Sequence, residues 1–204
     1  MSKIAPYKES SLTKRREPFR FMLLLGILGS LLIFTVLLAI YAVRKSAEIY
    51  WTQVPLPSLF WVSTMAIITS SGTLHLAQYA LRTDKFVQYR FYIAATLLLS
   101  ILFIVLQLLG WKQLIDAGIS TMHNPSVGFI YLLSGVHLAH ILVGILALVW
   151  AVYKAFKNYS YIDSFVFSVN PPNQLKLRLL AIYWHFVDAL WIGIFLFLLF
   201  HHGV

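Results

Sequence analysis

Five long apolar stretches constrain the fold of this 204-residue chain more than any other feature. Each is long enough to cross a hydrocarbon core of about 30 Å, which takes roughly 20 helical residues. Lipid offers a bare backbone no hydrogen-bond partners, and the stretches lack the alternation of barrel strands, so each is predicted to be a transmembrane helix. The predicted fold class is an all-α membrane protein, a bundle of five transmembrane helices. The predicted helices cover residues 21–43, 54–81, 91–111, 126–153 and 179–200.

Basic residues are distributed unevenly between the two ends of these helices. Six Lys and Arg residues precede the first stretch, three lie in the second connection and four in the fourth, which places thirteen on one side. The other side has two and one, or three in all. Because cytoplasmic loops are enriched in Lys and Arg, the N-terminus is predicted inside and the C-terminus outside. Residues 1–20 are then a basic cytoplasmic tail and residues 21–204 the five-helix domain.

This charge pattern also bears on the function classes that the composition allows. The net charge of +9 is explained by membrane topology, so no nucleic-acid partner is expected. The chain contains no cysteine, which excludes disulfides, thiolate metal sites and a cysteine nucleophile.

Proline and asparagine mark the expected helix ends. Pro55 and Pro57 suit the first turn of the second helix. Asn124 followed by Pro125 is typical of the start of the fourth helix. The run from Asn170 to Asn173 contains two prolines and is predicted to break any helix within the long connection 154–178.

Four ionisable residues within the last two apolar stretches are the main functional candidates. His185 and Asp188 share one helix face, while His137 and His140 lie about 60° apart on the preceding helix. An ionised carboxylate at this depth costs about 3 kcal/mol or more unless it is paired. We therefore predict a hydrogen-bonded cluster of His137, His140, His185 and Asp188. Two interpretations stay open: structural hydrogen bonds between two helices, or proton or ligand handling.

Other histidines suggest a different class of function. A b-type haem needs two imidazoles at matched depth on different helices, and His75 with His185 is the best such pair. His201 and His202 are expected to form a solvated end of the chain.

Small residues recur at helical spacing and are expected to let helices approach closely. They include Gly26 and Ser30 on the first helix, and Ser63, Ser70 and Thr73 on the second.

Two motifs resemble subunit III of the haem-copper terminal oxidases. Residues 183–188 read Tyr-Trp-His-Phe-Val-Asp and precede Trp191, and Gly135 begins a Gly-x-His-x-x-His pattern on the helix before. Weaker matches follow the same order along the chain, so the resemblance covers all five spans. The residues that carry it are Gly135, Tyr183, Trp184, Phe186, Trp191, Gln107, Gly72 and His75.

The resemblance implies the five-helix form of a non-catalytic subunit. Such a subunit packs directly against subunit I, stabilises it, binds phospholipid in a cleft and supports proton uptake. No catalytic, cofactor-binding or metal-binding residue is then assigned in this chain, and haem and copper are expected in partner subunits. Subunit II and other respiratory subunits are further implied partners, in the cytoplasmic (inner) membrane of a bacterium. The electron donor is either cytochrome c or a quinol. A small b-type haem redox protein is the alternative function.

This chain departs from the family pattern at two positions. Where the family usually has a Glu after a Ser on the first shared helix, Leu31 follows Ser30. Where a Glu-Tyr pair often follows the Gln of the third helix, Gly110 and Trp111 stand instead. Asp188 is therefore the only acid within the predicted spans.

Overall fold

A computed structural model describes residues 17–47, 51, 54–118, 124–157 and 160–202 of the chain. Five of its helices are long and apolar enough to cross a membrane, which confirms the predicted fold class. Residues 1–16 of the predicted cytoplasmic tail lie outside the described residues, and the orientation of the chain in a membrane stays a prediction. The helices are α2 (Glu17–Ala47), α3 (Leu59–Arg82), α4 (Phe86–Asp116), α5 (Pro125–Lys157), α6 (Tyr161–Val169) and α7 (Pro171–His202).

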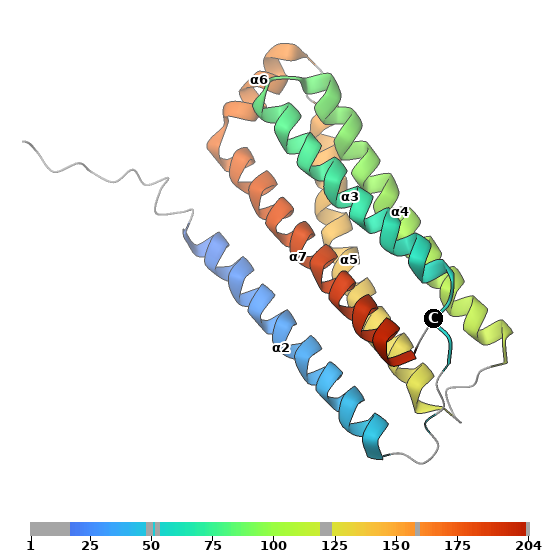
Figure 1. Cartoon of the computed structure of the whole chain (residues 1–204). Helices are drawn as coiled ribbons and strands as arrows, with labels where there is room; N and C mark the ends of the chain where they lie inside the picture. The colour runs from blue at the N-terminus through green and yellow to red at the C-terminus, as the bar shows by residue number, and fades with distance from the viewer. Residues whose placement is uncertain (1–16, 48–50, 52–53, 119–123, 158–159, 203–204) are drawn as a thin grey trace, which may run out of the picture.

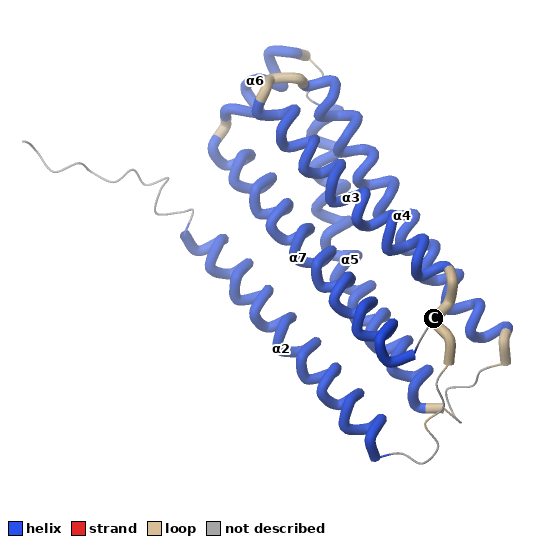
Figure 2. The backbone as a smooth tube through the Cα atoms, in the orientation of Figure 1, coloured by secondary structure: helices blue, strands red, loops and turns tan. Residues whose placement is uncertain are grey.

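The five long helices run alternately up and down, as short connections require (Figure 1). α3 and α4 lie side by side along their length, and α5 and α7 complete a four-helix bundle with them. α2 stands to one side of this bundle and contacts mainly α5 and α7. The tube in Figure 2 shows that α6 crosses the end of the bundle where α3 and α4 meet.

The helix ends follow the predicted signals in two of three places. α5 begins at Pro125, and the side-chain oxygen of Asn124 accepts a hydrogen bond from the N–H of Ser126 at 3.1 Å. α6 ends and α7 begins on either side of Asn170. The prediction for Pro55 and Pro57 was wrong: both precede α3, which starts only at Leu59, and the carbonyl of Pro57 accepts a hydrogen bond from the N–H of Phe60 at 3.0 Å.

The helix α6 is a second difference from the sequence prediction, which left residues 154–178 as a connection. α5 continues to Lys157 and α7 already begins at Pro171, so the long helices extend past their apolar stretches. The charged residues at these helix ends are compatible with the longer helices, because a charge that lies outside the hydrocarbon region keeps its water and has no desolvation cost. Nine residues of α6 fill what is left.

Two local features fix the end of the bundle where α6 lies. Asp84 adopts a positive φ of 56° after α3, and the N–H of Lys85 donates to the carbonyl of Ala80 at 2.9 Å, which closes the helix end. Buried Arg90 on α4 donates to the carbonyl of Ala155 at 3.0 Å and to the hydroxyl of Ser164 at 2.8 Å. Arg90 thereby joins α4, α5 and α6.

Candidate functional site

The two tryptophans of the α7 motif hold α7 against α3. Both side chains are fully buried. The indole nitrogen of Trp184 donates to the hydroxyl of Ser70 at 3.2 Å, and that of Trp191 donates to the hydroxyl of Thr64 at 3.0 Å. A buried indole N–H needs such a partner, so these hydroxyls fix the rotation of α7 at two levels.

A glycine on α5 allows the same tryptophan to pack closely. A Cβ atom added to Gly144 would lie 2.7 Å from Cζ3 of Trp184, too close for the ring to stay where it is. Tyr183, beside it, donates its hydroxyl to the carbonyl of His140 at 2.9 Å. At Gly135, by contrast, an added Cβ would make only ordinary contacts from 3.7 Å. The close approach of α5 and α7 therefore depends on Gly144.

His140 faces α2. Its Nδ1–H donates to the carbonyl of Val136 at 2.8 Å, and its Nε2 lies 3.0 Å from the hydroxyl oxygen of Ser30 on α2, whose own hydrogen is donated to the carbonyl of Gly26 at 2.9 Å. The ring also meets Phe34 of α2 edge-on, with the ring centroids 5.6 Å apart. This histidine is one of the few polar links between α2 and the bundle.

His185 faces α3. Its Nδ1 lies 2.6 Å from the hydroxyl of Ser71, and the side chain is half-buried. His75, which lies one turn further along α3, is exposed. Both imidazoles of the predicted haem pair therefore occur on the α3–α7 side of the molecule, one of them already bonded to a serine.

His137 and Asp188 are the two most deeply buried ionisable residues of the predicted cluster. His137 lies among rings, 5.0 Å from the centroid of Trp191 and 5.8 Å from that of Phe103. Neither of its nitrogens has a hydrogen-bond partner among the described residues, and neither has either carboxyl oxygen of Asp188. Buried polar atoms without partners are unusual and mark a place that needs an explanation.

The hydrogen bonds of the predicted cluster thus differ from those in the structure. The four residues come from α5 and α7 as expected, but the Asp188 carboxyl receives no hydrogen bond from an imidazole. The physical reason is the angle of about 60° between His137 and His140 around the axis of α5. Because α5 packs against several helices, this angle directs the ring of His137 into the core and the ring of His140 toward α2.

The remaining motif residues have different surroundings, and only Gln107 links α3 to α4 by a hydrogen bond. The amide of Gln107 donates to the hydroxyl of Ser63 at 2.9 Å. At Gly110, where the family often has an acid, the ring of Phe60 occupies the space, with Cε1 only 2.6 Å from where a Cβ would lie. Gly72 faces open space, and Phe186 packs at the edge of the core.

Two kinds of functional contact escaped the sequence prediction. Ser30 and Ser70 were expected only as small packing residues, yet their hydroxyls bond to motif side chains. His202 was expected in solvent but is buried, bonded to the hydroxyl of Tyr41 at 2.9 Å and to the carbonyl of Val54 at 3.0 Å. Ser and Thr at helix-facing positions were the available signal for the first kind.

An apolar cleft of about 520 Å³ opens between α2, α5 and α7. At one end the ammonium of Lys176 lies 4.9 Å from the centroid of the Trp150 ring. The residues that line the cleft are Leu23, Val143, Ala147, Trp150, Lys176, Leu179, Leu180 and Tyr183.

Fold and site together define a class: an all-α, multi-pass membrane protein whose buried layer of Trp, His and Asp side chains joins three helices. Within the described part of the chain, no group of three or more His, Cys, Asp or Glu residues is placed to hold a metal ion.

Known proteins similar to the chain give this class a more particular meaning. Cytochrome c oxidase subunit 3 of Bacillus sp. (strain PS3) is 27% identical over 198 residues, 94% of this chain and 88% of that protein. The probable quinol oxidase subunit 3 of Staphylococcus aureus is 28% identical over 160 residues, 76% of this chain and 70% of that protein. Cytochrome c oxidase subunit 3 of Corynebacterium diphtheriae is 27% identical over 135 residues, 66% of this chain and 62% of that protein. No protein-family model matches the chain. The resemblance to oxidase subunit III is thereby confirmed.

Proposed function

We propose that this chain is subunit III, a non-catalytic core subunit, of a proton-pumping respiratory terminal oxidase in a bacterial cytoplasmic membrane. The observation that carries the proposal is the match to an oxidase subunit 3 over 94% of the chain. The tryptophans of the α7 motif lie at the contact of α7 with α3. Both a cytochrome c oxidase and a quinol oxidase occur among the relatives, so either donor is compatible with it.

The subunit is proposed to pack directly on subunit I and to stabilise it, in an assembly that includes subunit II and holds the haem and copper. Support comes from the exposed apolar surface of α2. Only 6% of the residues in its apolar, membrane-spanning part are buried within the chain. Such a surface needs lipid or another membrane subunit to cover it.

Phospholipid binding is proposed for the cleft between α2, α5 and α7. Its walls are apolar over most of their area, which suits acyl chains, and Lys176 at one end suits a phosphate group. Leu23 of α2 lines one side of the cleft, so an acyl chain bound there would lie between α2 and the helices α5 and α7.

Support of proton uptake is part of the same proposal, with fewer acids than the family pattern provides. Leu31 is exposed on α2 where the family usually has Glu, and Gly110 is packed against Phe60. Asp188, buried and without a bonded partner among the described residues, is the acid that remains in the spans. Any proton-linked role of a membrane carboxyl in this subunit therefore falls to Asp188.

The test is isolation of the intact complex from native membrane through a tag on this chain, followed by identification of the subunits by mass and an optical spectrum. We expect co-purification with a larger haem-containing subunit, and no haem on this chain once it is separated. A solitary chain with a stoichiometric low-spin Soret band would overturn the proposal in favour of the b-type haem alternative with His75 and His185.

A second measurement tests the role of the buried acid. Asp188→Asn is expected to lower the yield of the assembled oxidase or to shorten its catalytic lifetime, because the acid lies in the layer that joins α7 to α3. The exposed acid Asp116, replaced by Asn, is the matched control. Equal yield and lifetime in both variants would remove Asp188 from the proposal.

A further inference from the structure

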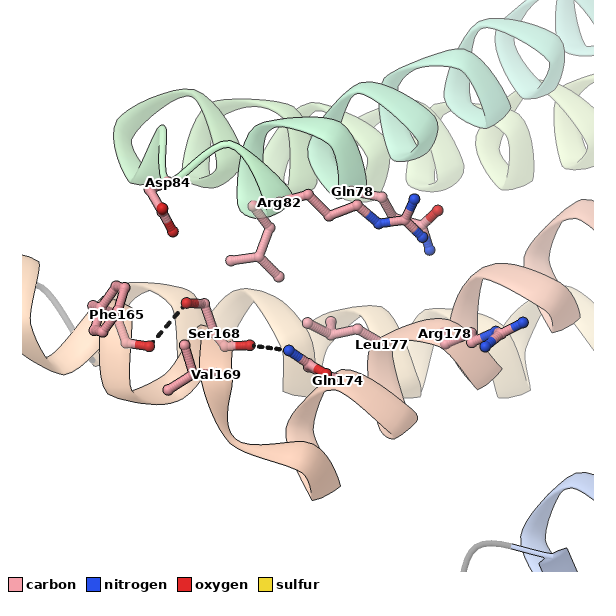
Figure 3. Close-up of a pocket in the computed structure, with 10 residues that line it drawn as sticks. Gln78, Arg82, Asp84, Phe165, Ser168, Val169, Gln174, Leu177 and Arg178 are labelled. Carbon is pink, nitrogen blue, oxygen red and sulfur yellow. Dashed lines mark hydrogen bonds between the residues drawn. The ribbon is translucent and has the colours of Figure 1, made fainter.

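A second hollow lies at the end of the bundle where α6 crosses, away from the cleft beside α2. Its volume is about 460 Å³, and it is formed by the end of α3, the turn after it, α6 and the start of α7. Figure 3 shows the side chains around it. They are Gln78, Leu81, Arg82, Asp84, Phe165, Ser168, Val169, Gln174, Leu177 and Arg178.

Two arginines from different helices give one end of this pocket a positive charge. Arg82 of α3 and Arg178 of α7 reach the same end of the pocket, while Asp84 lies at the opposite end (Figure 3). Among the described residues neither arginine forms a hydrogen bond or an ion pair with a side chain, and Asp84 pairs with neither. Guanidinium groups present paired N–H donors that match the oxygens of a phosphate.

The amide side chains near the arginines differ in their availability. Gln174 is already engaged, since its side-chain nitrogen donates to the carbonyl of Ser168 at 2.8 Å. Ser168 in turn donates its hydroxyl to the carbonyl of Phe165 at 2.8 Å. Gln78 lies one turn before Arg82 on α3, also lines the pocket, and its amide is a further possible donor.

Part of the pocket lining is apolar. It consists of Phe165 and Val169 of α6, Leu81 of α3 and Leu177 of α7. α6 also exposes apolar side chains to its surroundings, including Ile162 at 72%, as a helix in a membrane interface does. A free phosphate would use only the arginine end, whereas a phospholipid would place its phosphate there and its glycerol and acyl carbons along the apolar part of the lining.

We propose that this pocket binds the phosphate group of an anionic phospholipid between Arg82 and Arg178. The site differs from the cleft beside α2 in the helices that form it, in its two arginines and in its more polar lining. It depends on neither the oxidase assignment nor the membrane orientation, so a negative result here leaves the proposed function standing.

The experiment uses the full chain, purified and stripped of lipid, and titrated with phosphatidylglycerol or phosphatidylcholine while native mass spectrometry counts bound lipids. We expect one phosphatidylglycerol per chain at low lipid concentration and weaker binding of phosphatidylcholine. Arg82→Gln with Arg178→Gln should weaken the first binding step by about tenfold or more, because two charge-assisted contacts are lost. Arg82→Lys with Arg178→Lys should weaken it less, since charge is kept and only the paired donors are lost.

The matched control removes the same charge elsewhere: Arg20→Gln with Lys157→Gln changes two exposed residues at the same end of the bundle, outside the pocket. An equal loss in the control would show general charge attraction and overturn the site. Displacement of the lipid by inorganic phosphate in excess would show a site for free anions and overturn the lipid assignment. A double Gln variant that keeps its lipid but no longer co-purifies with the larger subunits would assign the arginines to a partner's acid instead. Circular dichroism of each variant separates these outcomes from misfolding.

Discussion

α2 and the pair formed by α3 and α4 show two different ways of holding transmembrane helices together. α3 and α4 are joined by a tight turn and touch along their whole length (Figure 1). Hydroxyl pairs link them inside the contact, such as Thr73 with Thr96 at 2.9 Å. α2 has the opposite character, with most of its apolar side chains exposed and with contacts to the bundle that combine the buried rings of Phe34 and Tyr41 with a few hydrogen bonds.

The glycines of the two regions make the same distinction. The ring of Trp184 packs directly against Gly144 in the bundle, but a Cβ added to Gly26 or Gly29 of α2 would meet nothing within 4 Å. Lipid chains are as apolar as leucine, so close packing and hydrogen bonds decide which helices associate. The bundle is therefore stabilised by contacts within the chain, whereas most of the apolar surface of α2 is left for lipid or another protein to cover.

The largest effect that this comparison predicts is on the bundle core. Trp184→Ala removes a fully buried ring together with its hydrogen bond to Ser70, and we expect a loss of about 3–5 kcal/mol in the free energy of unfolding. Unfolding in mixed micelles with increasing denaturing detergent measures it. Phe200→Ala, at a ring that is 87% exposed, is the control and should cost far less in the isolated chain. Similar costs for the two rings would break the distinction between packed and unpacked surface.

Adding a methyl group to each region should separate them at the next level. Gly144→Ala forces the buried Trp184 ring to move and should destabilise the chain by about 1–3 kcal/mol. Gly26→Ala meets open space and should leave stability unchanged or slightly improved, because alanine favours helix. The same unfolding assay applies to both variants. A destabilised Gly26→Ala variant would show that α2 packs closely against a neighbouring helix at Gly26.

The attachment of α2 should respond to a smaller change. Tyr41→Phe removes the hydroxyl that bonds to buried His202, and we expect a loss of about 1 kcal/mol, since His202 keeps its bond to Val54. The cysteine-free chain allows Phe34→Cys, at a buried position where α2 meets the bundle, to report separation by its rate of maleimide labelling. Labelling should be faster in the Tyr41→Phe background. Tyr153→Phe, at an exposed ring, is the control and should leave the rate unchanged.

The sequence was sufficient for the parts of this fold that depend on hydrophobic length. Five apolar stretches predicted five spans, and five helices of the structure are long and apolar enough to cross a membrane. The short α6 has no such signal, because nine residues with an apolar exposed face resemble any interfacial connection. The burial of His202 depends on Tyr41, which lies 161 residues away in the sequence, and local pattern carries no record of that pairing.

The candidate site shows the limit of periodicity most clearly. Helical spacing placed His137 and His140 near one face, but it does not say where the boundary between two neighbouring helices falls. The structure puts that boundary between the two rings, so His137 enters the core beside Trp191 and His140 reaches Ser30. Residue types and faces were predictable from the sequence, whereas partners required the rotation of α5 about its own axis.

The smallest predicted effect tests that boundary directly. A double-mutant cycle of Ser30→Ala and His140→Leu should give a coupling of about 0.6 kcal/mol, typical of polar pairs between transmembrane helices. A second cycle of His140→Leu with Asp188→Asn should be additive within error, because His140 faces α2 and the Asp188 carboxyl has no bonded partner among the described residues. Coupling in the second cycle and none in the first would restore the pairing of imidazole and carboxylate that the sequence suggested. It would also mean that the hydrogen bonds that hold α2 to the bundle are those at its C-terminal end, from Tyr41 and Lys45. The two cycles together therefore decide whether the middle of α2 belongs to the polar layer of the bundle or only passes beside it.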